Sequence, residues 1–293
     1  MSLPVTAVVV AHNSAAVLPA CLAALPQGAR AIVVDNGSTD DGAAIAAAHG
    51  AEVVRPARNL GFGPGANAGF ACVTTEFGLL LNADAVPQPG MFEELVAAAR
   101  RYPEAGMLAP AIRDEAGALQ FGRRLPHEPG PRALRITAPE GDCCAPYVGG
   151  SAMCFPMQAF RALGGFDPDI FLYYEDDDMC LRLRAAGHSL VHVAAARMRH
   201  AGGRSSAPST RLDRCKAWHQ GWSRLHLERK HRGRAAAWRL LLAEWPGLAL
   251  KAALRQGDAR HGKWSGRAAG MRAWARGVRA VEVGLDPDRS GMR

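Results

Sequence analysis

The stretch Leu79-Leu80-Leu81-Asn82-Ala83-Asp84-Ala85-Val86-Pro87 decides how this chain folds. Three consecutive leucines predict a buried β-strand, and the change to an amide, a small residue and a carboxylate predicts that the strand ends there. In an open α/β sheet, ligands bind outside the carboxyl ends of the strands, so Asn82 and Asp84 are placed to hold a hard cation through oxygen ligands. An Asx turn that only closes the strand explains the same residues equally well, so the rest of the sequence has to decide.

Strands and helices are predicted to alternate through the N-terminal part of the chain. The β-branched run at residues 5–10 is followed by a polar turn and a segment with helical spacing, and the same unit recurs. The predicted strands are residues 5–10, 31–34, 52–54, 79–81 and 105–112, and the predicted helices are residues 15–25, 42–49, 66–73 and 87–101. This alternation predicts an α/β fold with a mostly parallel sheet flanked by helices.

Length and composition suit one large α/β domain with an appendage, since the chain has 293 residues and is 48% apolar. It has no run of 18 uninterrupted apolar residues, and its N-terminus lacks the basic region and cleavage pattern of a signal peptide. We therefore expect a cytoplasmic protein. The seven cysteines are odd in number and include no C-x-x-C pair, which favours reduced thiols over a disulfide framework or a zinc site.

The formal net charge of +8 is unevenly distributed. Residues 197–280 contain 20 Lys and Arg against 4 Asp and Glu, a net charge of +16, which leaves 15 against 23, or −8, for everything else. This asymmetry predicts an anionic partner for the C-terminal part, such as a membrane leaflet, a lipid diphosphate or a nucleic acid.

Polar residues also follow the predicted strand at residues 31–34. Asp35 can accept hydrogen bonds from a ribose hydroxyl or a pyrimidine N–H, and Asn36-Gly37-Ser38 can turn the chain tightly around it. This arrangement suits a nucleotide. The alternative is that Asp35 is only a turn or helix-capping residue.

The glycine-rich segment 58–65 has a second interpretation. Gly63-x-Gly65-x-x-Ala68 formally satisfies the dinucleotide-binding pattern, which would make the chain a dinucleotide-dependent oxidoreductase. That pattern needs a strand running directly into the first glycine, whereas the predicted strand ends at Val54. No G-x-x-x-x-G-K-[ST] sequence occurs, which disfavours a P-loop nucleotidase.

Residues 114–146 are rich in Pro, Gly and Arg. They predict a long loop, either a flap that orders over a substrate or a plain surface loop. The following segment, residues 147–156, reads as a strand whose glycines allow a ligand or another backbone to approach closely.

A second acidic cluster, Glu175-Asp176-Asp177-Asp178, begins a predicted helix that ends near Gly187. Capping and the helix dipole account for two carboxylates at a helix start. Four carboxylates repel one another, and the preceding Tyr173-Tyr174 would shield the first of them from water, which gives a general base a useful pKa.

Five ordered motifs together resemble the family 2 glycosyltransferases of GT-A fold, and most closely their rhamnosyltransferase-like subgroup. The resemblance covers roughly residues 4–205. The motifs are Val8-Val9-Val10-Ala11-His12-Asn13-Ser14, Val33-Val34-Asp35-Asn36-Gly37-Ser38-Thr39-Asp40, Arg58-Asn59-Leu60-Gly61-Phe62-Gly63, Leu80-Leu81-Asn82-Ala83-Asp84 and Tyr174-Glu175-Asp176-Asp177-Asp178-Met179-Cys180-Leu181-Arg182.

The resemblance implies two groups of nucleotide-binding residues, to which Asn82 is added. The nucleoside pocket would be lined by Ala11, Asn13, Asp35 and Asn36, and the residues closing over the nucleotide would be Arg58, Asn59, Gly61 and Phe62.

Asn82 and Asp84 match the family's D-x-D metal motif, with Asn in the first position and Ala83 where a proline is often found. An amide weakens a cation site by a full charge, so His200 is a further candidate ligand for Mg²⁺ or Mn²⁺; an ordinary polar loop residue is the alternative for His200. Asp176 matches the catalytic base, with Glu175 as the alternative and Asp178 as a support of the helix start.

The implied reaction is an inverting transfer of a sugar from a nucleoside-diphosphate donor to a hydroxyl of a glycan or lipid-linked acceptor. The subgroup favours dTDP-L-rhamnose as the donor, with UDP-sugars and GDP-mannose as alternatives. A retaining reaction would need a second carboxylate on the opposite face of the sugar. Asp177 and Asp178 follow Asp176 in the same acidic turn, so they cannot lie on the opposite face of a bound sugar.

Residues 1–210 are predicted to form the catalytic domain, with a nucleotide-binding half at about 1–112 and an acceptor half at about 113–210. The part after residue 210 is predicted to be a basic, tryptophan-rich helical extension. Its tryptophans are Trp218, Trp222, Trp238, Trp245, Trp264 and Trp274. Tryptophan among cationic residues is typical of an interfacial helix, so we expect contact with the anionic cytoplasmic leaflet of a membrane, most of all through 238–253. The alternatives are that these tryptophans pack a helical subdomain, or that the chain is a basic membrane or nucleic-acid adaptor with structural acidic motifs. No recognition motif for nucleic acid accompanies the charge, so none is expected as a partner.

Overall fold

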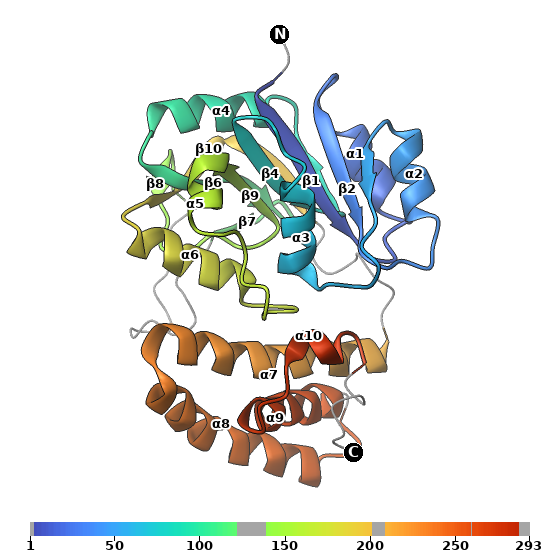
Figure 1. Cartoon of the computed structure of the whole chain (residues 1–293), viewed down its shortest axis with the longest axis vertical. Helices are drawn as coiled ribbons and strands as arrows, with labels where there is room; N and C mark the ends of the chain where they lie inside the picture. The colour runs from blue at the N-terminus through green and yellow to red at the C-terminus, as the bar shows by residue number, and fades with distance from the viewer. Residues whose placement is uncertain (1–2, 122–138, 201–208, 259, 287–293) are drawn as a thin grey trace. The chain divides into compact units, whose positions relative to one another are not determined.

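A computed structural model of the chain describes residues 3–121, 139–200, 209–258 and 260–286 (Figure 1). These residues divide into two compact units. The sheet unit comprises Met1–Asn59, Gly65–Phe166 and Asp176–Ser206, and the helical unit comprises Leu60–Pro64, Asp167–Glu175 and Ala207–Arg293. Two short segments from the middle of the sequence therefore group with the C-terminal helices.

The sheet unit is built on one mixed ten-stranded sheet. Its strands are β1 (Val5–Ala11), β2 (Arg30–Asp35), β3 (Glu52–Val54), β4 (Phe77–Asn82), β5 (Ala85–Pro87), β6 (Ala105–Arg113), β7 (Leu119–Gln120), β8 (Cys143–Cys144), β9 (Ala152–Pro156) and β10 (Ser189–His200). The strand order is β3-β2-β1-β4-β9-β6-β10-β5, with β7 beside β6 and β8 beside β10.

The predicted α/β fold is confirmed, and its N-terminal half is parallel as expected. Strands β1, β2, β3 and β4 pair only in parallel with one another. The second half is mixed, because β9 enters antiparallel to both β4 and β6. In the parallel half Ala11 lies opposite Asp35 and Val10 lies opposite Asn82, so the polar ends of β1, β2 and β4 share one edge of the sheet.

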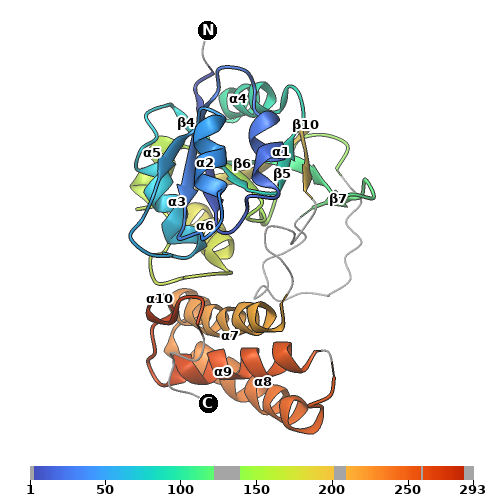
Figure 2. The same ribbon diagram turned by 90° about the vertical axis from the view of Figure 1, so that its right-hand side faces the viewer.

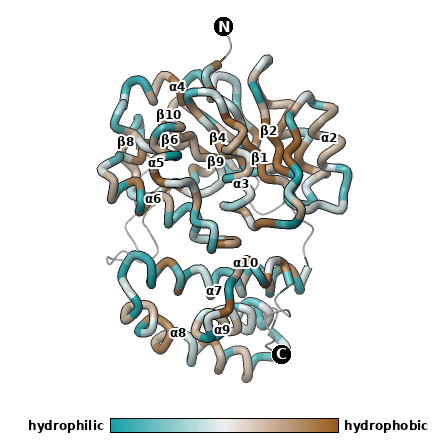
Figure 3. Tube along the Cα trace, in the orientation of Figure 1, coloured by the Kyte–Doolittle hydropathy of each residue, from teal (hydrophilic) through white to brown (hydrophobic). Residues whose placement is uncertain are grey.

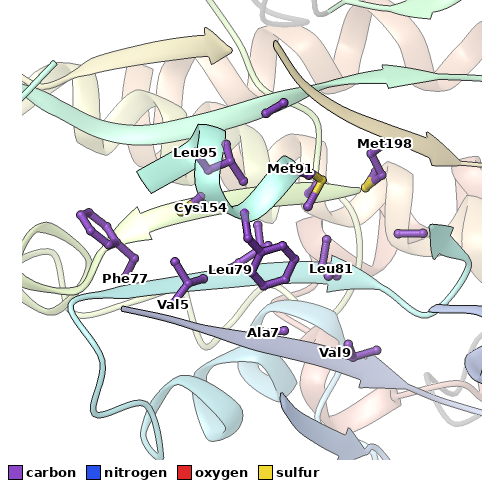
Figure 4. Close-up of a cluster of buried hydrophobic side chains, with 14 of the residues drawn as sticks. Val5, Ala7, Val9, Phe77, Leu79, Leu81, Met91, Leu95, Cys154 and Met198 are labelled. Carbon is purple, nitrogen blue, oxygen red and sulfur yellow. The ribbon is translucent and has the colours of Figure 1, made fainter. Parts of the chain in front are cut away.

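The main core lies between one face of this sheet and three helices (Figure 4). These are α1 (Leu18–Ala23), α2 (Gly42–Ala48) and α4 (Met91–Arg101). Leu79 and Leu81 of β4 have no exposed surface, and burying each leucine contributes about 1.5–3 kcal/mol. Figure 3 shows the strands of the parallel half as largely hydrophobic, which is the pattern of a sheet covered on both faces.

The other face of the sheet is covered by α3 (Phe62–Phe70) and α5 (Met157–Ala162). Phe70 packs against Phe155, Phe160 and Phe166, with ring centroids 4.4–6.4 Å apart. Gly69 allows α3 to approach the sheet, because a side chain there would collide with Val8 and Val34.

Several elements differ from the sequence prediction, either in where they begin or because they were not predicted. Helix α3 begins at Phe62 rather than at residue 66, so Gly63 and Gly65 lie inside a helix instead of a strand-to-helix turn. This geometry removes the basis of the dinucleotide-binding interpretation. Strand β10 was not predicted, although Ala196, Met198 and His200 are buried and alternate with exposed arginines, which is the period of a strand. Helix α5 was also missed.

The predicted loop at residues 114–146 is only partly described. Its beginning and end contribute β7 and β8 to the sheet, while residues 122–138 lie outside the described residues.

The helical unit consists mainly of α7 (Thr210–Arg232), α8 (Arg234–Leu254), α9 (His261–Ala275) and α10 (Ala280–Val283). Figures 1 and 2 show α7, α8 and α9 side by side. Gly266 and Gly270 bring α9 close to α7, because a side chain at either would collide with a backbone carbonyl of α7. Among the described residues, no helix combines the length and the apolar character needed to span a membrane.

Three tryptophans of this unit pack against its other segments. Trp218 and Trp222 are only 1% and 4% exposed, and the Trp222 indole N–H donates to the Val278 carbonyl. Trp245 donates likewise to the Ala268 carbonyl. The alternative in which tryptophans pack a helical subdomain is therefore the one realised for these side chains.

The segment Asp167–Glu175 belongs to the helical unit, where Phe171 lies in the same cluster as Trp218 and Trp222. Tyr173 and Tyr174 have φ values of 66° and 69°, a left-handed conformation that costs a side-chain-bearing residue about 1–2 kcal/mol. Such strain is commonly stored beside functional residues, and here it directly precedes the acidic cluster.

Candidate active site

The first part of the candidate site is the turn after β2. The Asn36 N–H donates to the Ala11 carbonyl (2.8 Å), and Gly37 adopts φ +76°, so the chain turns sharply at the sheet edge. One Asp35 oxygen accepts the Ser38 N–H (3.1 Å), and the other lies 3.4 Å from Arg55 Nε. The turn-closing role considered for Asp35 is thus present, and its side chain still has exposed surface for a ligand.

Asn13 forms the facing side of this turn. It is exposed and left-handed, with φ 51°, and its side-chain oxygen accepts the Thr39 N–H at 2.8 Å. Its own N–H donates to the Ser38 hydroxyl at 3.0 Å. These bonds tie the ends of β1 and β2 into one rigid polar rim.

Asn59 lies at the same rim through His12. The His12 Nδ1 atom is 3.2 Å from both the Asn36 carbonyl oxygen and Asn59 Nδ2. Arg58 is exposed. The structure therefore gathers the four residues of the predicted nucleoside pocket, Ala11, Asn13, Asp35 and Asn36, at one edge of the sheet unit, with Asn59 of the predicted closing group beside them. Their binding of a nucleotide remains a prediction.

The second part of the site lies at the end of β4. The Asn82 N–H donates to the Ser151 carbonyl (3.1 Å), and Asp84 follows in the turn to β5. His200 ends β10, which pairs with β5 so that His200 lies opposite Ala85. His200 is therefore a strand residue, and the interpretation of it as a loop residue is wrong; residues 201–203 of its motif lie outside the described residues.

Three polar side chains converge at this point. His200 Nε2 is 3.2 Å from Asp84 Oδ1 and 3.3 Å from Asn82 Nδ2. Its other nitrogen, Nδ1, lies 3.3 Å from the Ser151 hydroxyl, which orients the ring. Asp84 and His200 are buried, at 6% and 8% exposure.

These residues fit a divalent cation. The carboxylate and the amide each lie within 3.3 Å of the imidazole, and together they offer oxygen and nitrogen ligands, a combination suited to Mn²⁺ and, with fewer protein ligands and more water, to Mg²⁺. The Ser151 hydroxyl would serve as the outer partner that metal-bound histidines usually have.

The third part of the site is Asp176, in the first turn of α6 (Glu175–Ala185). One carboxylate oxygen accepts hydrogen bonds from the Tyr147 hydroxyl (2.5 Å) and the Gly150 N–H (2.9 Å). Burial raises the pKa of Asp176, and the Tyr147 and backbone hydrogen bonds oppose that shift. A carboxylate with a raised pKa has a higher affinity for a proton, and these hydrogen bonds fix its position. Both properties suit a general base.

The neighbouring carboxylates have different environments. Asp178 has no exposed surface and pairs with Arg182 at 2.7 Å, and Arg182 also donates to the carbonyls of Leu163 and Gly165. Asp177 is buried, which, with the charges of Asp176 and Asp178, raises its pKa to about 8. Asp178 is thus structural, and the surroundings of Asp177 disfavour its charged form.

Three predicted residues belong to the helical unit. Glu175 is buried there, and the Phe62 N–H donates to the Phe171 carbonyl at 2.8 Å. Gly61 has φ +92°, and a side chain on it would collide with the Phe171 backbone. Their roles beside the base and over the nucleotide remain predictions.

One further group of potential metal ligands lies in the helical unit, formed by Asp167, Asp169 and His226. Lys230 already occupies it, with its ammonium 2.6 Å from Asp167. Burial alone would raise the pKa of Asp167. Hydrogen bonds from His226 and Lys230 outweigh burial and hold this pKa well below its usual range. This cluster is accounted for as an ion-pair network.

The sequence did not single out three residues that complete the site. His12 lies inside a quoted motif and Ser151 inside the predicted strand segment at residues 147–156, but nothing local shows that they contact Asn59 and His200. Tyr147 precedes Asp176 by 29 residues, and only the folded chain brings the two together.

Comparison with known proteins agrees with this geometry. A family model described as glycosyl transferase family 2 matches residues 6–155. An uncharacterized glycosyltransferase of Mycobacterium tuberculosis (strain ATCC 25618 / H37Rv), Rv0539, is 43% identical over 117 residues, which are 37% of this chain and 53% of that protein.

An N-acetylglucosaminyl-diphospho-decaprenol L-rhamnosyltransferase of the same strain is 30% identical over 200 residues, covering 58% of this chain and 65% of that protein. The chain thus spans between half and two thirds of the length of these curated relatives. The mannosyltransferase PcManGT from Pyrobaculum calidifontis, solved with GDP-Man and Mn²⁺, shares the fold with a TM-score of 0.56 at 17% identity, over 94% of this chain and 87% of that one. The chain has the GT-A fold and belongs to glycosyl transferase family 2.

Proposed function

We propose that this glycosyltransferase moves a sugar from a nucleoside-diphosphate donor to an acceptor hydroxyl with inversion at the anomeric carbon, and that Asp176 is the general base. The observation that carries the proposal is the Asp176 carboxylate, held by Tyr147 and Gly150 in the same unit as the polar strand ends. We further propose that residues 1–210 form the catalytic domain, with the nucleotide bound by the N-terminal half.

The reaction is a single displacement. The acceptor hydroxyl gives its proton to Asp176 as its oxygen attacks the anomeric carbon, and the bond to the nucleoside diphosphate breaks on the opposite side. Retention would need a second carboxylate as nucleophile. Asp177 and Asp178 are both buried, and Asp178 is paired with Arg182, so neither suits that role.

Asp84, Asn82 and His200 would hold a divalent cation, Mn²⁺ or Mg²⁺. When bound, the cation neutralises charge on the diphosphate leaving group. The rim of Ala11, Asn13, Asp35, Asn36 and Asn59 positions the nucleoside, and Arg58, Gly61 and Phe62 complete the predicted nucleotide set.

We favour L-rhamnose as the sugar and dTDP as its carrier, because the rhamnosyltransferase relative acts, by its name, with that sugar. A thermal-shift screen of the purified chain against dTDP, UDP, GDP, CDP and NAD(P), each with and without Mn²⁺, tests the donor. A ligand at 100 times its Kd adds about 2.7 kcal/mol to the free energy of unfolding, so one nucleoside diphosphate is expected to raise Tm visibly. A shift with NAD(P) alone would contradict the proposed donor class.

Replacing Tyr147 by Phe is expected to move the rising limb of the pH–activity profile to higher pH. Burial raises the pKa of Asp176, and the hydrogen bond donated by the Tyr147 hydroxyl lowers it. Removing that hydroxyl therefore raises the pKa further. Because the base acts when ionised, activity then appears at higher pH. The measurement is nucleoside-diphosphate release against pH.

Tyr102→Phe is the matched control for this prediction. Tyr102 also donates to an aspartate, Asp142, at 3.3 Å, but that pair is not part of the site. An identical profile for Tyr147→Phe and the parent would show that Tyr147 does not tune the base.

We propose that the acceptor is lipid-linked and that the chain works at the cytoplasmic face of a membrane, because the relative's named substrate is a diphospho-decaprenol. Helix α8 supports membrane contact. Leu242, Leu250 and Leu254 are 71%, 59% and 74% exposed, and they follow one another at helical spacings of eight and four residues. Arg239, Lys251 and Arg255 are exposed beside them, which complements an anionic leaflet.

The variant Leu242→Ser/Leu250→Ser/Leu254→Ser is expected to bind phosphatidylcholine vesicles containing phosphatidylglycerol about 100-fold more weakly than the parent. A leucine side chain that is partly immersed in the interface contributes about 1 kcal/mol to the free energy of membrane binding, and its replacement by serine removes that contribution. Vesicle co-sedimentation measures the change. Ala243→Ser, on the same exposed side of α8, serves as the control, and equal binding by the triple variant and the parent would exclude the leucine ridge as the contact.

A further inference from the structure

The helical unit contains a cavity of about 320 Å³ that the transfer reaction does not use. Its lining residues are Arg229, Arg234, Trp238, Trp274, Ala275 and Gly277. They come from the last turn of α7, the first turns of α8 and the C-terminal end of α9 with the residues after it. The volume is near the lower end of the range for small-molecule sites, and none of the lining residues is acidic.

Two cations line this cavity. The nearest carboxylates along α7 and α8 are already engaged, because Glu228 pairs with Arg232 at 2.9 Å and Glu244 with Arg224 at 2.8 Å. Within the described parts of the chain, neither Arg229 nor Arg234 has an ion-pair partner. Two arginines without ion-pair partners in the lining of one small cavity match a phosphate, which arginine binds through parallel hydrogen bonds.

The remaining wall is aromatic. Trp238 and Trp274 are half-buried, with ring centroids 5.8 Å apart at an interplanar angle of 63°. Trp238 also lies one helical turn before Leu242, the first of the exposed leucines of α8. The cavity therefore joins a cationic pocket to the exposed leucine ridge, the arrangement required by a ligand with a charged head and an apolar tail.

We propose that this cavity binds the phosphate headgroup of an anionic membrane lipid whose acyl chain runs along the leucine ridge of α8. The assignment rests on the proposed membrane contact of α8, and it is independent of the sugar-transfer chemistry. It gives the chain a second, non-catalytic site for a phosphate ester.

The first experiment titrates the full chain with dihexanoyl phosphatidic acid below its critical micelle concentration. Binding is followed by the change in tryptophan fluorescence, to which Trp238 and Trp274 contribute because they line the cavity. Arg229→Gln/Arg234→Gln is expected to weaken binding at least about tenfold, because each charge-assisted hydrogen bond to phosphate is lost. Lys216→Gln/Lys263→Gln removes the same charge from α7 and α9 at positions outside the cavity lining and outside the leucine ridge, and it is expected to change binding by less than about twofold, because the screened field of distant charges acts weakly on a soluble ligand.

Three results decide the matter. Equal losses in the two double variants would overturn the proposal, because the basic surface as a whole would then be the binder. Inorganic phosphate that binds as tightly as the soluble lipid would overturn the assignment of a lipid. Binding of the soluble lipid without binding of phosphatidic acid vesicles would support the cavity and reject the leucine ridge. A parent-like thermal shift with the nucleoside diphosphate shows that each variant is folded and that the catalytic proposal is a separate matter.

Discussion

The Asp176→Asn variant is expected to release nucleoside diphosphate from the donor about 1,000-fold more slowly than the parent, with nucleotide binding unchanged. A positioned general base contributes about 10²–10⁴-fold to a rate. The amide keeps an oxygen that can accept the hydrogen bonds from Tyr147 and Gly150, so the local structure is preserved. It cannot take the proton of the attacking hydroxyl, so the loss appears in kcat. Release of the nucleoside diphosphate measures kcat, and the thermal shift measures binding.

Asp177→Asn is the control that the structure offers for this prediction. Asp177 lies next to the base in sequence, and burial with the neighbouring charges raises its pKa, so the site already disfavours a charged side chain at this position. Its replacement by a neutral amide should leave kcat close to that of the parent. If Asp177→Asn were as slow as Asp176→Asn, or if Glu175→Gln alone abolished turnover, the base would have been assigned to the wrong carboxylate.

The parallel half of the fold could be predicted from sequence because its strands are buried on both faces. Such strands read as continuous hydrophobic runs, and β1, β2 and β4 were predicted to within about two residues at each end. Strand β10 was missed since its second half alternates alanine and methionine with arginine, a weaker signal that resembles a polar segment. The start of α3 was missed because Gly63 and Pro64 indicate a turn, although proline is tolerated in the first turn of a helix.

The candidate site divides in the same way. Asp35, Asn82 and Asp84 could be predicted because they follow hydrophobic strands directly, and the sheet alone brings strand ends together. The partners that fix their chemistry come from distant segments: Ser151 contacts His200 across 49 residues and Tyr147 contacts Asp176 across 29. Those contacts depend on where β9 and β10 enter the sheet, and no local pattern specifies that.

The tryptophans show a further limit of composition. Trp among Arg and Lys is typical of a membrane interface, yet Trp218 and Trp222 are buried in the helical unit. The side chains left exposed on α8 are leucines, which the sequence pattern does not distinguish from core leucines. Which side of a helix packs inward is set by its neighbours, so the residues proposed to contact the membrane could be named only from the structure.

Replacing Asp84 by Ala is expected to weaken Mn²⁺ binding at least about 100-fold and to remove the Mn²⁺-dependent part of the nucleoside-diphosphate thermal shift. Asp84 is the only carboxylate among Asn82, Asp84 and His200, so its loss leaves two neutral ligands and no compensating charge. Loss of even an outer-shell partner typically costs a metal site 10–100-fold in affinity. Binding of Mn²⁺ is followed directly by the electron paramagnetic resonance of the free ion.

His200→Ala separates the role of the histidine from that of the carboxylate. As a neutral ligand, His200 should contribute less than Asp84, so a loss of about tenfold in Mn²⁺ affinity is expected if it binds the ion. An unchanged affinity would mean that His200 only holds Asp84 through the 3.2 Å contact. Glu93→Ala, on the exposed side of α4, removes one carboxylate from the same unit and should leave Mn²⁺ binding intact. If Asp84→Ala resembled Glu93→Ala, the turn after β4 would only close the strand, and the diphosphate would need its positive charge from elsewhere in the chain.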